Sequence, residues 1–311
     1  PRKFKIAVTG SSIDRAATKL HDIGLKLIRN KEDEVGFEVM VGGGQGRTPM
    51  VAKTIREFLP QKHLLSYLES ILRVYNLMGR RDNKYKARIK ILVHEMGVES
   101  FSSEVEKEWN KIKNSVVNLP TEELDRIKSY FKKPSIKENK DNIPNYSSSS
   151  SNNKLFSLWM ESNVLQHAEV NYSIVNISLK KPGSVPGDAT AEQMDIVADL
   201  GKIYSSDEIR VTYEQNLVLP HVLNKNLLTV WNKLQSAGLA TPNLGLVSDI
   251  IACPGLDYCS LANARSISVA QEIAKTFESI DRERHVGPLK IKISGCINAC
   301  GHHHAGHIGI L

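Results

Sequence analysis

The sequence predicts an α/β protein that contains two related copies of one unit, and two observations lead to this prediction. Strand-like apolar runs alternate with helix-like runs along most of the 311 residues. The strand, hydroxyl and glycine pattern of Lys5–Gly10 also returns at Leu289–Gly295, and Ile23–Leu25 returns at Ile308–Ile310. Both echoes have the same offset of 285 residues. Repeated units commonly share a fold, so we expect the two regions to have the same local structure.

Residues 1–131 are expected to form the first α/β domain. Strands are predicted at Phe4–Thr9 and at Gly36–Val41, where apolar and β-branched residues gather. Thr48-Pro49 is a typical helix start, because a capping hydroxyl precedes a proline at the first helical position. The helix predicted from there buries three apolar side chains, those of Val51, Ile55 and Phe58.

The end of this domain is predicted to be helical. Lys62–Met78 carries leucines and isoleucines at helical spacing, and Gly79 ends that helix. The basic stretch Arg80–Lys90 leads into another helix. Upstream, Gly42–Gly46 lacks the Gly-x-Gly-x-x-Gly spacing of dinucleotide-binding proteins, so this segment does not favour such a site.

The second half begins after a polar segment. Residues 132–165 are interpreted as a polar loop or linker because they include the serine run Ser147–Ser151. Residues 166–240 then alternate strand-like and helix-like runs, which indicates a βαβ-type half-domain. Its first helix is predicted to start at a capping box made by Thr190 and Gln193.

Charge and hydropathy narrow the possible partners. No apolar run reaches the roughly 18 residues that a membrane-spanning helix needs, so no membrane partner is expected. The formal net charge is +7, but no zinc finger or groove-binding basic helix is found, so no nucleic-acid partner is expected, and a polyanionic ligand explains the charge at least as well. The chain begins at Pro1, and its second copy stops at Leu311 where the first continues, so we expect residues to be missing at both ends.

The chemistry of the chain is concentrated in its four cysteines. They form the pairs Cys253-x5-Cys259 and Cys296-x3-Cys300, in a region expected to form a fourth segment, 241–311. Four thiolates can hold a [4Fe–4S] cluster, and nearby glycines let the backbone approach its sulfurs. Structural zinc, two disulfides or four inert thiols are the alternatives. Cysteines confined to one end differ from a secreted disulfide scaffold and indicate a reducing, cytoplasmic compartment.

The residues around the cysteines point to a family. Cys253-Pro-Gly-Leu-Asp-Tyr-Cys259 and Gly295-Cys-Ile-Asn-Ala-Cys-Gly301 resemble the cluster motifs of the sulfite reductase hemoprotein and assimilatory nitrite reductase family. The opening Pro1–Lys5 is similar to that family's anion-binding lysine segment, and the turn at Gly42–Gly46 resembles the family's glycine-rich turn. The resemblance implies a pseudo-twofold α/β repeat with a ferredoxin-like half-domain between the copies.

The resemblance also assigns residues. It implies that the four cysteines ligate the cluster and that the sulfur of Cys300 also ligates siroheme iron. It implies that Lys3 and Lys5 meet the substrate anion. Positions at or near the siroheme are implied for a further set: Arg2, Arg88, Gln215, Asn216 and Asn298.

The implied function is the six-electron reduction of sulfite to sulfide, with nitrite reduction to ammonia as the alternative. Cofactors must supply the electrons, cations stabilise the oxyanion, and lysines can donate protons. No flavin or pyridine-nucleotide motif is present, so a separate donor protein, a ferredoxin or a flavoprotein, is expected. A non-enzymatic iron–sulfur or zinc-stapled binding module is an alternative of another class. The histidines at 302–304 and His307 are expected to pack or hydrogen-bond rather than act chemically.

Overall fold

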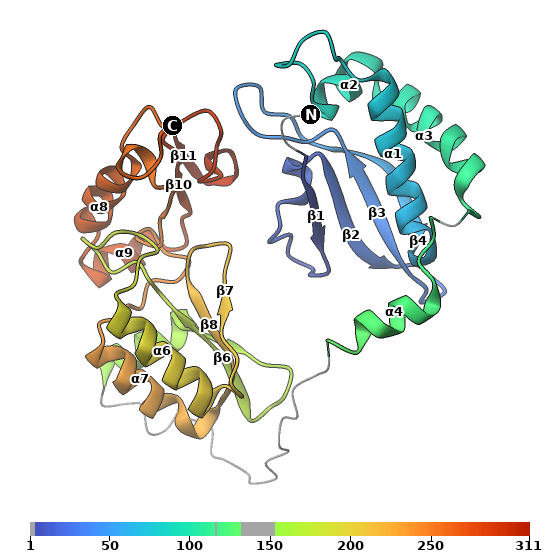
Figure 1. Ribbon diagram of the computed structural model, residues 1–311. Coiled ribbons are helices and arrows are strands. Elements are labelled where there is room, and N and C mark those ends of the chain that lie inside the picture. The colour runs from blue at the N-terminus through green and yellow to red at the C-terminus, as the bar shows by residue number, and fades with distance from the viewer. Residues whose placement is uncertain (1–3, 116, 132–152) are drawn as a thin grey trace. The chain divides into compact units, whose positions relative to one another are not determined.

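The computed structural model describes residues 4–115, 117–131 and 153–311. The chain divides into two compact units, residues 1–132 and 133–311, which Figure 1 shows as the blue-to-green and the yellow-to-red parts. The serine run Ser147–Ser151 lies outside the described residues. Within the described ranges, no helix is long and apolar enough to cross a membrane.

The first unit is built on a four-stranded sheet. Its strands are β1 (Ile6–Thr9), β2 (Ile23–Arg29), β3 (Val35–Val41) and β4 (Lys53–Pro60), and they follow one another in that order across the sheet. β1 runs parallel to β2, whereas β2, β3 and β4 are antiparallel neighbours. The strands predicted at the start of the chain and before the glycine-rich segment are therefore confirmed.

The helix predicted from Thr48-Pro49 is wrong, because β4 occupies that stretch. The capping signal is present, but the residues after it pair with β3, for example Thr54 with Met40. As part of the sheet, the stretch places the side chain of Leu59 in the core, where it is completely buried. Tertiary pairing has overridden a local helix-start signal, as it commonly does for β-branched and aromatic segments.

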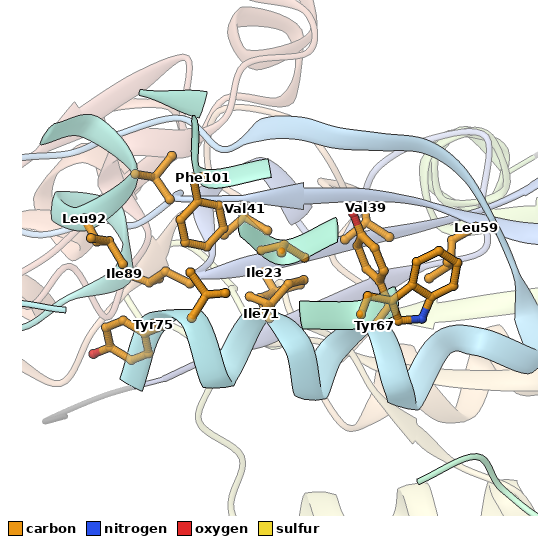
Figure 2. Close-up of a cluster of buried hydrophobic side chains, with 14 of the residues drawn as sticks. Ile23, Val39, Val41, Leu59, Tyr67, Ile71, Tyr75, Ile89, Leu92 and Phe101 are labelled. Atoms are coloured by element: carbon orange, nitrogen blue, oxygen red, sulfur yellow. The ribbon is translucent and has the colours of Figure 1, made fainter. Parts of the chain in front are cut away.

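Helices complete the first core. α1 (Leu64–Met78), predicted from its spacing, packs beside α3 (Val98–Ile112), and α2 (Ile89–Met96) and α4 (Thr121–Lys128) are shorter. Figure 2 shows Tyr67 and Ile71 of α1 pointing at the sheet residues Val39 and Val41. This apolar contact holds the helices on the sheet.

The second unit opens with a half-domain. Its helices α5 (Lys154–Asn163), α6 (Ala191–Tyr204) and α7 (Leu227–Ser236) pack on strands β5 (Val164–Gln166), β6 (Tyr172–Ile177), β7 (Arg210–Val211) and β8 (Leu217–Leu223). The sheet order is β5-β6-β8-β7 with every pair antiparallel. β6 and β7 thus run parallel on either side of β8, which is the split βαβ arrangement of ferredoxin-like folds.

The half-domain confirms one prediction from the sequence and contradicts another. The capping box of Thr190 and Gln193 is confirmed at the start of α6. The interpretation of 132–165 as a polar loop is wrong from Lys154 onward, because α5 lies there and buries Phe156 and Trp159 in the core. The polar residues just before α5 dominate the composition of this stretch, and α5 itself has few apolar residues, although they are large.

The cysteine-bearing part of the second unit has a small parallel sheet. Its strands are β9 (Ile251–Ala252), β10 (Ile291–Ile293) and β11 (Ile308–Ile310), in the order β11-β10-β9. Helix α8 (Ser266–Thr276) contributes Ala270 and Ala274 to the core beneath it, and α9 (Ile280–Val286) follows.

The predicted internal repeat is confirmed in the pairing register. Ile6 pairs with Ile23 in the first unit, and Ile291 pairs with Ile308 in the second, at the same offset of 285 residues. A short 3-10 turn precedes each second strand, at Thr18–Leu20 and at His303–Ala305. Each turn is entered through a left-handed residue, Ala17 or His302. The two copies therefore share a backbone course as well as a sequence pattern.

Candidate functional site

The cysteine motifs meet at one edge of the small parallel sheet. Cys253 directly follows β9 and Cys296 lies three residues after β10, so both motifs leave the carboxyl ends of neighbouring strands. The amide of Gly295 donates to Sγ of Cys253 at 3.1 Å. The carbonyl of Gly295 in turn accepts from the amides of Asn263 and Ala264 at 2.8 and 3.1 Å. These bonds join two motifs that are far apart in sequence.

Close backbone contact explains the glycines here. A Cβ atom on Gly295 would lie 2.6 Å from the carbonyl oxygen of Ala264, and one on Gly301 would collide with the carbonyl of Ile293. Gly255 has a φ of +58°, which a side chain rarely adopts. The glycines thus let the loops approach each other closely enough to share one site.

The four thiols are free and differ in exposure. Cys253 is buried, Cys259 and Cys296 are intermediate, and Cys300 is exposed. Among the residues that the structure describes, no three histidine, cysteine, aspartate or glutamate side chains are grouped to hold a metal ion. A cubane cluster instead takes its thiolates on separate irons. Free thiols on two joined loops, with an amide already donating to one sulfur, fit that group.

The amides predicted at the siroheme have protein partners. Nε2 of Gln215 donates to the carbonyl of Ala252 at 2.9 Å, and Oε1 accepts from the Ala252 amide at 3.1 Å. Asn216 bonds Asp249 and the amide of Leu179 at 3.0 and 3.1 Å. Gln215 therefore holds the residue just before Cys253, and contact of either amide with a cofactor stays a prediction. Nδ2 of the third amide, Asn298, lies 3.5 Å from Sγ of Cys296.

A buried ionic network beneath the cysteines was missed by sequence reasoning. Nζ of Lys180 lies 2.8 Å from Oδ1 of Asp249, and the two side chains are only 1% and 4% exposed. Nζ of Lys290 lies 2.9 Å from Oε1 of Glu214. Nothing in the local pattern around Lys180 indicates burial, since its partner is 69 residues away. These pairs attach the half-domain to the strands that carry the cysteines.

The anion-binding residues predicted in the first unit are described only in part. Lys3 and Arg2 lie outside the described residues, and Lys5 is exposed. The Lys5 backbone amide donates to Oδ2 of Asp22 at 3.0 Å. Nε and Nη2 of Arg88 donate to Oδ1 of the same carboxylate at 3.0 and 2.7 Å. Asp22 thus fixes both the start of β1 and the Arg88 guanidinium, which keeps 22% of its side chain exposed.

The glycine-rich turn is tied down by Lys90. Its Nζ donates to the carbonyls of Gln45 and Thr48 at 3.0 and 2.6 Å. A Cβ on Gly44 would lie 2.9 Å from the Lys90 side chain and 3.1 Å from that of Arg88. Glycine at this position lets the two basic side chains pack directly against the turn.

The histidines have structural surroundings. Nδ1 of His307 accepts from the Lys290 amide at 3.0 Å, and His303 is buried with its ring 4.0 Å from that of His304. Burial lowers the pKa of His303, and the neighbouring His304 lowers it further. His221 lies between His167 and Glu208, with nitrogen and oxygen partners at 3.1 and 3.3 Å. These contacts fit the packed, hydrogen-bonded role expected of the histidines at 302–304 and of His307.

One family model matches a segment of each unit. The model of the nitrite and sulphite reductase 4Fe-4S domain matches residues 1–113, and that of the nitrite/sulfite reductase ferredoxin-like half domain matches residues 182–237. The second match covers α6, β7, β8 and α7 of the half-domain and begins after β6.

Individual relatives extend the likeness over the whole chain. A protein named sulfite reductase [ferredoxin] 2 from Mycolicibacterium paratuberculosis is 23% identical over 100% of this chain and 49% of its own length. The chloroplastic ferredoxin–nitrite reductase of Arabidopsis thaliana is 25% identical over 100% of this chain and 47% of its own length. The Mycobacterium tuberculosis NirA structure has a TM-score of 0.69 and 23% identity, covering 96% of this chain and 48% of its own. The chain thus spans about half the length of these relatives.

Proposed function

The chain belongs to the nitrite and sulfite reductase family, and from this premise we propose that it forms the cluster-bearing part of an enzyme that reduces sulfite to sulfide. The contact that carries the proposal is the Gly295 amide on Sγ of Cys253, because it joins both cysteine motifs in one site. Cys253, Cys259, Cys296 and Cys300 would hold a [4Fe–4S] cluster, with Cys300 also the ligand of siroheme iron.

Some residues of this chain would hold the cofactors, and others would bind and protonate the substrate. When bound, the siroheme and cluster supply electrons one at a time for a six-electron reduction. Backbone amides such as that of Gly295 stabilise thiolate sulfur by donating to it. Lys5, and with it Lys3, would stabilise the negative charge of the substrate oxyanion and donate protons to its oxygens.

The electron donor is proposed to be a separate ferredoxin. The relatives named above carry ferredoxin in their names, as sulfite reductase [ferredoxin] 2 and as ferredoxin–nitrite reductase. Nitrite reduction to ammonia by the same residues is the second candidate. The chain is 25% and 26% identical to two ferredoxin–nitrite reductases, which is similar to its 23% identity to the sulfite reductase.

The experiment is to purify the full-length protein, record its visible spectrum and assay reduction of sulfite and nitrite. We expect absorption of both a tetrapyrrole and an iron–sulfur cluster, with a higher kcat/KM for sulfite. Lys5→Ala should lower kcat/KM on the order of a hundredfold with little change in the spectrum. Lys31→Ala is the matched control, because Lys31 is exposed in the turn after the far end of β2.

Three results would contradict this assignment. A colourless protein, or one with a cluster but no tetrapyrrole, would favour a non-enzymatic binding module. A higher kcat/KM for nitrite would select the second candidate. Equal activity of Lys5→Ala and Lys31→Ala would make Lys5 an ordinary surface charge.

A further inference from the structure

Lys292 is a buried lysine in the middle strand of the cysteine-bearing sheet. It lies in β10 and is only 6% exposed. Within the described ranges its ammonium has no hydrogen-bond or ion-pair partner. Lysines are almost never this buried without a partner, because removing an ammonium from water is costly. Burial, and after it the neighbouring Lys290, lower the pKa of Lys292, so a further negative group close by would be needed to keep this ammonium charged.

The acids near Lys292 already serve other lysines. Asp249 is paired with Lys180, and Glu214 is paired with Lys290. Successive residues of a strand face opposite sides, and the neighbours Ile291 and Ile293 belong to the apolar core. Lys292 therefore lies on the other, polar face. The two ion pairs, Lys180 with Asp249 and Lys290 with Glu214, are each neutral overall. Lys292, when protonated, therefore adds one positive charge that neither pair balances.

The backbone of Lys292 lies close to that of a cysteine that directly follows the neighbouring strand. Lys292 pairs with Ile251 on β9, two residues before Cys253, and with Gly309 on β11. Strand spacings place the Cα atoms of Lys292 and Cys253 about 8 Å apart. A lysine side chain is long enough to bring its charge to the region of the cysteine sulfurs. On the β11 side, the backbone of His303 packs directly against Gly309, where a Cβ atom would collide with the His303 carbonyl.

We propose that Lys292 is the fixed counter-charge of the iron–sulfur cluster and raises its reduction potential. This inference rests on the cluster of the proposed function. Four thiolates make a cubane anionic, and one electron accepted from the donor protein adds one further negative charge. A cation at this range stabilises the reduced form more than the oxidised form, by roughly a tenfold factor at an effective dielectric constant of about 20. Lys292 acts on the cluster as a positioning charge rather than as a ligand.

The test is a redox titration of the cluster in the full-length holoprotein, followed by electron paramagnetic resonance. Lys292→Met removes the charge but keeps an unbranched side chain, and Lys292→Gln repeats the neutralisation with a polar one. Both should lower the midpoint potential by about 59 mV, the equivalent of a tenfold change in a one-electron equilibrium. Lys292→Arg should keep the potential of the wild type. Lys275→Met is the matched control, since it removes an exposed lysine at the end of α8.

The outcomes separate this inference from the proposed function. An intact cluster with an unchanged potential in Lys292→Met and Lys292→Gln overturns the inference alone. Loss of tetrapyrrole absorbance at an unchanged cluster potential also overturns it, because Lys292 would then bind a carboxylate of that cofactor. A wild-type protein without iron and acid-labile sulfide overturns the proposed function, and with it the anion that Lys292 needs.

Discussion

Replacing Gln215 with leucine should detach the strand that leads into Cys253. The Gln215 amide makes two hydrogen bonds to Ala252 on β9, which is the edge strand of its sheet among the residues that the structure describes. Leucine keeps the volume but removes both bonds. Ala252 is 4% exposed, so its amide and carbonyl would be left without water. An unsatisfied buried backbone group costs about 1–3 kcal/mol, and the pair together should cost about 2–4 kcal/mol.

Two assays would measure this effect. Thermal unfolding should show a Tm lower by about 5–15 °C, since 1 kcal/mol is worth about 2–4 °C in a domain of this size. Iron and sulfide per chain should also fall, because Cys253 follows the loosened residue. Gln235→Leu is the control, since Gln235 is exposed on α7. A Gln215→Leu protein with unchanged Tm and iron that has lost only siroheme would refute this reasoning and assign Gln215 to the cofactor.

Two further predictions concern buried charges. Arg88→Met should destabilise the first unit by about 3–5 kcal/mol in urea unfolding, because the 1% exposed Asp22 carboxylate loses the guanidinium that balances its charge and, within the described part of the chain, keeps only the Lys5 amide. Adding Asp22→Asn should recover part of the loss. Unchanged stability would show that Asp22 does not depend on Arg88. Burial raises the pKa of Glu283, so the stabilisation from its protonated form is complete below about 4.5 and is lost as the pH rises. The Tm of Glu283→Gln minus that of the wild type should therefore increase between pH 4.5 and 8. A Tm difference that does not change with pH would contradict the raised pKa of Glu283.

Local patterns were sufficient where a feature depends on neighbours in sequence. The capping box at Thr190 needs only Gln193, three residues on, and the spacing of α1 needs only its own apolar face. The repeat was visible because each copy must pair two parallel strands in one register, which preserves both the residues and their separation.

Long-range contacts set the limits of the sequence prediction. β4 carries a helix-start signal, and only its pairing with β3 makes it a strand. The burial of Lys180 depends on Asp249, which follows it by 69 residues. Gln215 was assigned to the siroheme by resemblance, but its hydrogen bonds to Ala252 depend on how the half-domain packs against β9. No local pattern encodes any of these three partners.

The most direct test of the central claim is the iron and acid-labile sulfide content of Cys296→Ser in the full-length protein. If the four cysteines hold a [4Fe–4S] cluster, the wild type should contain about four of each per chain. Cys296→Ser should lose most of both and should unfold at a lower temperature, because cluster binding and folding are coupled. Ser260→Ala, next to Cys259 and exposed, should match the wild type. Unchanged iron and sulfide in Cys296→Ser would contradict the assignment of these ligands.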